Sequence, residues 1–211
     1  LIPFVFFPWT AAASLFLVPW LILSAFDASA PVMIAGFAVW GALAAFASEF
    51  VQRTGRAALT KYHPPLLVLS LPLFLVAIFW GLGEDILYGF AAFLGTGIAY
   101  TFVNILRPSW YIWLTALLAG LCAYFTFFSL PFMEKADVYF GYQLLGASLL
   151  LLIPELFSKE PFSFRRAWSW PPIVLGSLLT GLNLLITIVM QAEVINRSGN
   201  SAIILGVYAL L

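Results

Sequence analysis

The stretch from Ile86 to Leu106 reads ILYGFAAFLGTGIAYTFVNIL and contains no charged residue. An α-helix needs about 20 apolar residues to cross the roughly 30 Å hydrocarbon core of a bilayer. The acidic pair Glu84 and Asp85 precedes this run, and Arg107 follows it. A long apolar run with charges only at its ends is typical of a membrane-spanning helix, because every backbone polar group is then satisfied inside the segment.

Similar apolar runs recur along the whole chain. The third and sixth are slightly short for a span, whereas the other full runs have the required length. We therefore predict an all-α polytopic transmembrane helix bundle that forms a single domain over residues 1–211, with seven full spans and the start of an eighth. The runs are Pro8–Phe26, Pro31–Phe50, Pro65–Trp80, Ile86–Leu106, Trp110–Phe132, Val138–Ile153, Pro172–Gln191 and the partial run Ile203–Leu211.

The composition excludes a water-soluble domain. Apolar residues make up 64% of the chain and charged residues only 9%, against about 25% charged residues in soluble domains. The formal net charge is zero, so no basic face is present for nucleic acid. Because the sequence begins with Leu and stops inside an apolar run, we expect it to be a piece of a longer protein.

The positive charges predict an orientation, since Lys and Arg in short loops mark the cytoplasmic side. Most of them fall in the gaps after the second, fourth and sixth runs, which places the N-terminus in the cytoplasm. Acidic residues lean toward the opposite gaps. The cytoplasmic set is Arg53, Arg56, Lys61, Arg107, Lys159, Arg165 and Arg166; the exceptions are Lys135 and Arg197; the outer acidic residues are Asp27, Glu84, Asp85, Glu134, Asp137 and Glu193.

Prolines and acidic residues predict where helices begin. Pro31, Pro65 and Pro172 stand at the starts of their runs, where the missing backbone donor has no consequence. Asp85 lies directly before Ile86, so its negative charge meets the positive end of the helix dipole. The sequence therefore predicts helix starts at these four places.

Two further prolines lie within or near the ends of runs. Pro72 is in the middle of the third run, which predicts a kink unless neighbouring groups satisfy the carbonyl that loses its donor. Pro154 is expected to end the sixth helix, and Glu155 follows it. No charge is expected at the bilayer centre; Glu49 and Glu155 are the nearest candidates, and we expect both at cytoplasmic helix ends.

Uncharged polar residues form stripes along the fourth, fifth, sixth and seventh predicted helices. Lipid cannot satisfy their hydrogen bonds, so they must face protein or water. Two interpretations remain open. In the favoured one, the stripes hydrogen-bond between closely packed helices; in the other, they line a path or pocket for a ligand. The residues that we predict to face a ligand or a partner are Thr96, Tyr100, Asn104, Thr126, Gln143, Thr180, Asn183 and Thr187.

No catalytic, cofactor or metal motif is recognisable. His63 is the single histidine and lies in the loop sequence Tyr62-His63-Pro64-Pro65, with no Cys, Asp or Glu at the spacing of a metal site. A nucleophile motif of the Gly-x-Ser-x-Gly kind is absent from the sequence. We therefore predict no catalytic residues, no bound metal and no cofactor.

These observations favour a non-enzymatic integral membrane subunit of a larger assembly. Its expected partners are membrane lipids and other integral membrane subunits, and no nucleic acid. One alternative is a transporter or permease for a neutral or lipophilic small solute, which would use the polar stripes. A second alternative is the membrane input module of a sensor protein whose output domain follows Leu211.

Overall fold

A computed structural model describes residues 2–134, 139–158, 168–193 and 198–209. Every regular element within these residues is an α-helix, so the predicted all-α class is confirmed. The chain divides into two compact units, Leu1–Leu130 (unit 1) and Pro131–Leu211 (unit 2). The predicted charges Lys135, Asp137, Lys159, Arg165, Arg166 and Arg197 lie outside the described residues.

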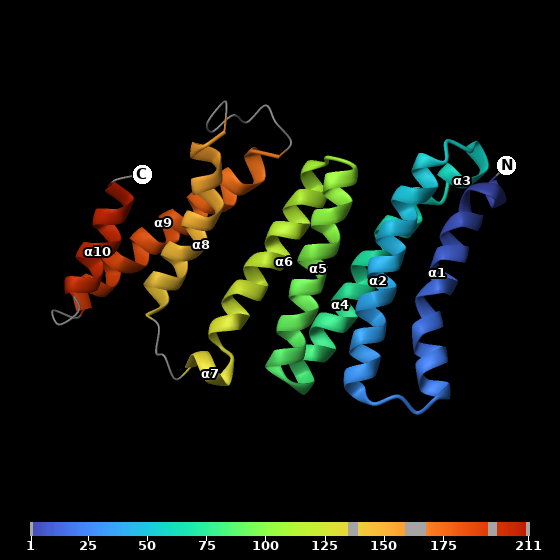
Figure 1. Cartoon of the computed structure of the whole chain (residues 1–211), viewed down its shortest axis with the longest axis horizontal. Helices are drawn as coiled ribbons and strands as arrows, with labels where there is room; N and C mark the ends of the chain where they lie inside the picture. The colour runs from blue at the N-terminus through green and yellow to red at the C-terminus, as the bar shows by residue number, and fades with distance from the viewer. Residues whose placement is uncertain (1, 135–138, 159–167, 194–197, 210–211) are drawn as a thin grey trace. The chain divides into compact units, whose positions relative to one another are not determined.

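Unit 1 is built around three long helices that pack on one another. Helix α2 packs against α4 and α5, α4 packs against α5, and α6 packs against α5. Helix α1 packs against α2 and α4. The helices of this unit, labelled in Figure 1, are α1 (Ile2–Ala25), α2 (Ala30–Arg53), α3 (Ala57–Thr60), α4 (His63–Glu84), α5 (Ile86–Leu106) and α6 (Trp110–Phe128).

The centre of unit 1 is held together by close approach of α2 and α4. Leu73, Phe74 and Ala77 of α4 are almost completely buried. A Cβ atom added at Gly41 of α2 would lie 3.3 Å from Leu73 Cβ and from the Phe74 ring. The absence of a side chain at Gly41 therefore allows the two helices to pack tightly, as small residues commonly do between membrane helices.

The described residues of unit 2 form four helices. Helix α9 packs along α8, and α10 contacts both of them. Ala147 of α8, Ile204 of α10 and Asn183 of α9 are fully buried between these helices. The elements are α7 (Pro131–Glu134), α8 (Phe140–Leu156), α9 (Trp170–Glu193) and α10 (Ser198–Ala209).

Six helices in the described part of the chain are long and apolar enough to cross a membrane, which indicates a multi-pass membrane protein. They are α1, α2, α4, α5, α6 and α9. Helix α8 has 17 residues and α10 has 12, and 17 residues rise only about 25 Å. The count of seven full spans and the orientation of the N-terminus stay predictions.

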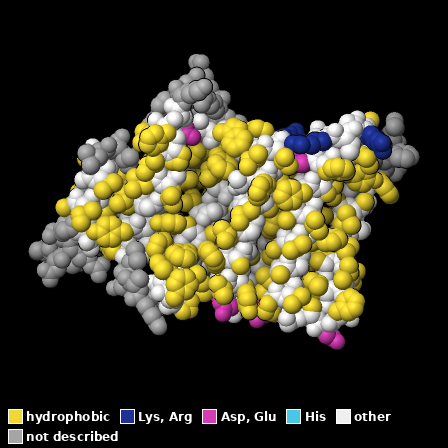
Figure 2. All heavy atoms as spheres, viewed as in Figure 1, with side chains coloured by type: hydrophobic (Ala, Val, Ile, Leu, Met, Phe, Trp, Pro, Cys, Tyr) yellow, Lys and Arg dark blue, Asp and Glu magenta, His cyan; other side chains and the backbone are white. Residues whose placement is uncertain are grey.

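The surface of the helices is apolar along their length, with charges at their ends. In Figure 2 the Lys and Arg side chains of unit 1 gather at one end, and most acidic side chains lie at the other. This separation agrees with the alternation of charge along the sequence. Because exposed Leu, Phe, Ile and Val side chains cover the faces between the two ends, the surface suits a lipid environment.

The predicted helix starts are confirmed. Pro31 lies in the first turn of α2, Pro65 in the first turn of α4 and Pro172 in the first turn of α9. Asp85 is the N-cap of α5, and its Oδ1 accepts a hydrogen bond of 2.7 Å from the Leu87 amide. The cap satisfies one of the amides that a helix start leaves without a partner.

Pro72 and Pro154 do not interrupt their helices. Helix α4 runs through Pro72 from His63 to Glu84. The expectation that Pro154 ends its helix is wrong, because α8 continues through Pro154 to Leu156. Pro154 stands in the last turn of α8, where the broken backbone hydrogen bond affects only the end of the helix.

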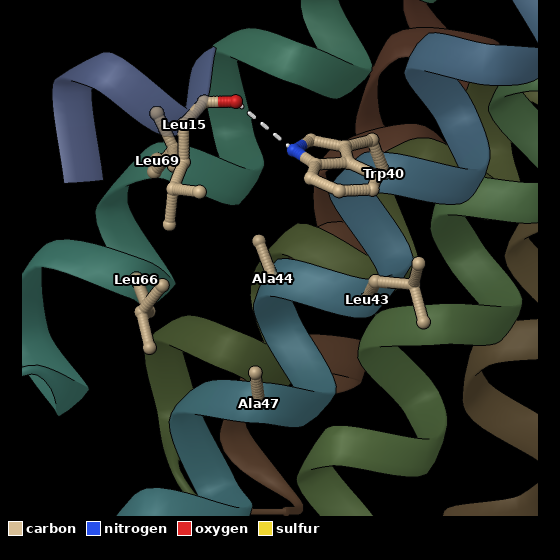
Figure 3. A pocket seen from close by; sticks show the side chains of 7 residues that line it. All are labelled: Leu15, Trp40, Leu43, Ala44, Ala47, Leu66 and Leu69. Atoms are coloured by element: carbon tan, nitrogen blue, oxygen red, sulfur yellow. Dashed lines mark hydrogen bonds between the residues drawn. The ribbon is translucent and has the colours of Figure 1, made fainter. Parts of the chain in front are cut away.

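Helix α1 is attached to the rest of unit 1 by a hydrogen bond that compensates for a proline. Pro19 lacks the N–H that would otherwise bond the carbonyl of Leu15, four residues earlier. The Trp40 indole Nε1 of α2 donates to this oxygen at 3.0 Å, as Figure 3 shows. Beside this bond lies an apolar cavity of about 130 Å³ lined by Leu15, Trp40, Leu43, Ala44, Ala47, Leu66 and Leu69.

Trp40→Phe should weaken the attachment of α1, because it removes the indole donor and keeps an aromatic ring. We expect a loss of about 1 kcal/mol in the free energy of unfolding. Pro19→Ala gives the Leu15 carbonyl its own helical donor, so Trp40→Phe should cost little in that background. The free energy of unfolding in detergent is measured for the wild type, the two single variants and the double variant. If Trp40→Phe lowers it equally in the wild-type and the Pro19→Ala backgrounds, the proposed coupling is contradicted.

Candidate functional site

The strongest concentration of chemistry in unit 1 is a buried group at the ends of α2, α4 and α5. It consists of Glu49, His63 and Arg107, together with the Ser48 carbonyl, and is called the helix-end cluster below. Glu49 is 2% exposed and His63 is 8% exposed, while Arg107 is half-buried. Charged groups are rarely buried to this extent unless they are paired. The question is therefore which partners each of these side chains has.

Local structure brings these three side chains together. Glu49 lies in the last turns of α2, and the chain then reverses at Gly55, whose φ of 65° is a left-handed conformation that suits glycine. After the short helix α3, His63 begins α4. Arg107 directly follows α5, and because α2, α4 and α5 pack on one another, their ends meet.

The hydrogen bonds of His63 define its protonation state. Its Nδ1 lies 3.1 Å from the Ser48 carbonyl oxygen, which can only accept, so Nδ1 carries a proton. Its Nε2 is hydrogen-bonded to Arg107 Nη1, which can only donate, so Nε2 carries none. The imidazole is therefore neutral, with its proton on Nδ1.

Glu49 has an incomplete set of partners. Its Oε1 lies 3.9 Å from His63 Nδ1 and forms no hydrogen bond to any described residue. Glu49 and Arg107 thus stand on different sides of the imidazole, near Nδ1 and Nε2 respectively. This arrangement can hold the guanidinium in a fixed position.

The sequence offered a partial signal for this cluster. His63 was expected in a loop with no ligand-type neighbour, but it begins α4 and lies beside Glu49. Gly41, Ala45, Ser48 and Glu49 are all buried on one face of α2. A glutamate that continues a face of small residues is a sign of burial, but the distant Arg107 could be placed only by the fold.

A metal site has no support in the described residues, where no group of three or more His, Cys, Asp or Glu side chains is found. His63 and Glu49 supply only two potential ligands, and stable zinc sites use three or four protein ligands.

The predicted stripe on α5 is buried within unit 1. The Tyr100 hydroxyl and Ser70 Oγ of α4 lie 2.6 Å apart, which ties α5 to α4. Asn104 Oδ1 accepts from the Ser109 amide at 2.9 Å, while its Nδ2 has no partner among the described residues. Thr96 Oγ1 donates to the Ala92 carbonyl of its own helix. These side chains mainly serve the packing of α5 and the turn into α6.

A second polar group joins the three main helices of unit 2. Asn183 Nδ2 of α9 donates to the Gly141 carbonyl of α8 at 3.0 Å and to the Tyr208 hydroxyl of α10 at 2.9 Å. The Tyr208 hydroxyl also lies 3.0 Å from Ser148 Oγ of α8. Asn183 Oδ1 and Thr187 Oγ1, one helical turn apart, are buried without a partner among the described residues.

The remaining predicted residues are less buried. Thr126 of α6 and Thr180 of α9 are half-buried, and their hydroxyls donate to carbonyls of their own helices, those of Cys122 and Gly176. Gln143 is half-buried on α8. The predicted set is thus divided between the two units, and each unit brings together only its own members.

Glu155 was also expected at a helix end. It lies in the last turn of α8, is 9% exposed, and its Oε2 has no hydrogen-bond partner in the described structure. No histidine or arginine of the described residues contacts Glu155 in an ion pair or hydrogen bond.

The chain was compared with family models, curated proteins and solved structures, and no match was found. Six long apolar helices place it in the broad class of multi-pass membrane proteins. Within that class, function is inferred from the residues and contacts of this chain alone.

The protonation state of His63 is directly measurable, because the chain has one histidine. In protein labelled with ¹⁵N-histidine and placed in lipid nanodiscs, we expect nitrogen shifts of a neutral ring protonated at Nδ1. His63→Asn removes the signal and serves as its assignment control. A ring protonated at Nε2, or an imidazolium at neutral pH, contradicts the geometry described above.

Proposed function

We propose that this chain is a non-enzymatic integral membrane subunit of a larger membrane protein assembly. The observation that carries the proposal is how the polar stripes are used. Thr96, Thr126 and Thr180 bond to their own helices, and Tyr100 and Asn183 join neighbouring helices. Side chains engaged in this way support packing rather than a polar path for a solute.

The exposed side of α5 supports association with another spanning helix. Ala91 and Gly95 are exposed one turn apart, and a Cβ added at Gly95 would meet no atom within 4 Å. Small residues on an outward face permit close approach of a second helix. Next to them is an apolar groove between α2 and α5, with a volume of about 240 Å³, lined by Pro31, Ile34, Ala35, Ala38, Val39, Tyr88, Ala91 and Ala92.

The proposed topology has the N-terminus and the Arg53 and Arg107 ends in the cytoplasm, with seven spans and the start of an eighth. The separation of basic from acidic helix ends in unit 1 supports it. In a Cys122→Ser background, Ala57→Cys should react with a membrane-impermeant maleimide only from the cytoplasmic side, and Ser29→Cys only from the other side. The reverse labelling pattern contradicts the orientation.

The subunit proposal predicts defined companions. The full-length protein, purified from its native membrane in mild detergent, should carry other membrane proteins at a fixed ratio, as mass spectrometry would show. A photo-cross-linking residue in place of Val39, which lines the groove and is 58% exposed, should give a discrete protein adduct. The same residue in place of Phe79, which is 69% exposed outside the groove lining, is the matched control.

A protein that purifies alone and gives no adduct at position 39 contradicts the subunit proposal. That outcome would favour the second candidate, a permease for a neutral or lipophilic solute. One observation favours this candidate specifically: Asn183 Oδ1 and Thr187 Oγ1 are buried polar atoms without a partner in the described residues, and such atoms are costly unless a water or a ligand bonds to them.

A further inference from the structure

One end of unit 1 carries a concentrated positive charge. Its four cations are Arg53, which ends α2, Arg56 and Lys61, which flank α3, and Arg107, which follows α5. Figure 2 shows dark blue Lys and Arg side chains at this end of the unit. The carboxylate that accompanies them, Glu49, is buried. The exposed acidic residues of this unit are Asp27, Glu84 and Asp85, which lie at the opposite helix ends.

Two of these four cations, Arg53 and Arg107, are each held by a hydrogen bond at the end of α5. Arg53 Nη2 donates to the Leu106 carbonyl at 3.2 Å, and Arg107, the next residue after Leu106, donates to His63. Both guanidinium groups therefore lie at the end of α5. Arg56 and Lys61 are exposed, and their side chains form no hydrogen bond to the described residues.

The support given to Arg107 exceeds what a topology signal requires. A lysine or arginine sets orientation by its charge alone and needs no fixed geometry. Here a buried imidazole holds the guanidinium, a backbone carbonyl holds the imidazole, and a buried carboxylate stands behind both. Burying such groups is unfavourable, so the fold maintains Arg107 in one position at some cost to stability.

The helix dipoles also hold these cations without satisfying their donors. Arg53 ends α2 and Arg107 follows α5, so each lies near a negative helix end. A guanidinium has five N–H donors, and each of these two uses one in the bonds described. The remaining donors suit an oxyanion with several acceptor oxygens, and guanidinium groups bind phosphate in a bidentate manner.

The depth of this pair points to a lipid. The ends of spanning helices lie at the level of the headgroups, and the exposed aromatic residues Trp110 and Tyr111 begin α6 three and four residues after Arg107, as interfacial anchors do. We propose that Arg53 and Arg107 bind the phosphate of an anionic phospholipid, with His63 as the positioning residue for Arg107. This proposal stands independently of the subunit function and of orientation.

The test measures how strongly the full chain retains lipid. The protein is reconstituted in nanodiscs of phosphatidylcholine with phosphatidylglycerol, and the bound phosphatidylglycerol is counted by native mass spectrometry. We expect Arg53→Gln and Arg107→Gln each to lower retention roughly tenfold or more, as loss of a charged hydrogen bond does. The charge-matched controls Arg56→Gln and Lys61→Gln should lower it about twofold or less.

His63→Ala distinguishes a positioned guanidinium from a general positive field, because it leaves the net charge unchanged. Retention should fall toward that of Arg107→Gln. If this variant does not fold, Arg107→Lys serves the same purpose, since it keeps the charge and loses the planar fork. Full retention of phosphatidylglycerol in whichever of these two variants is used overturns the requirement for a positioned guanidinium, and with it the role of His63.

Two results overturn the site itself. Equal losses of about fivefold for all four cations indicate a diffuse attraction to anionic lipid. Displacement of phosphatidylglycerol by millimolar inorganic phosphate, at constant ionic strength, would assign the pair to a soluble phosphate compound. Insensitivity to inorganic phosphate, together with the selective loss at Arg53 and Arg107, supports a lipid headgroup.

Discussion

The constraint on which this structure depends is that a bilayer offers no hydrogen bonds. Every polar group within the apolar region must find its partner inside the protein. The long helices meet this constraint for the backbone, and three side chains bond across helices: Trp40 to the Leu15 carbonyl, Tyr100 to Ser70, and Asn183 to Tyr208. Each of these bonds joins two different helices, so satisfying a polar group also fixes a packing register.

The coarse fold could be predicted from the sequence because the length and the start of a helix depend on residues that are adjacent in the chain. Apolar length defines the long helices, and proline and Asp85 define where several of them begin. The boundary at Pro154 could not be predicted in this way, because a proline in a last turn removes only one bond and the helix can continue past it to Leu156. The sequence predicts seven full spans, whereas six described helices are long and apolar enough to cross a membrane. Helix α8 accounts for the difference, because it has an apolar composition but a marginal length.

The candidate site was less predictable, because it depends on contacts between distant parts of the chain. Helical spacing identified Tyr100, Asn104 and Asn183 as buried polar residues. It did not show that Thr96 and Thr180 would bond to their own helices, because a threonine on a stripe has the same spacing in either case. His63 and Arg107 are 44 residues apart and meet only because α4 and α5 pack side by side.

The hydrogen bond between Trp40 and Leu15 has a consequence for biogenesis. While α1 is alone in the bilayer, Pro19 leaves the Leu15 carbonyl without a donor, at a cost of up to several kcal/mol. The donor arrives only with the next helix, on the other side of the turn at residues 26–29. Helices α1 and α2 therefore gain by leaving the translocation channel as a hairpin, and a proline in α1 links its membrane insertion to that of α2.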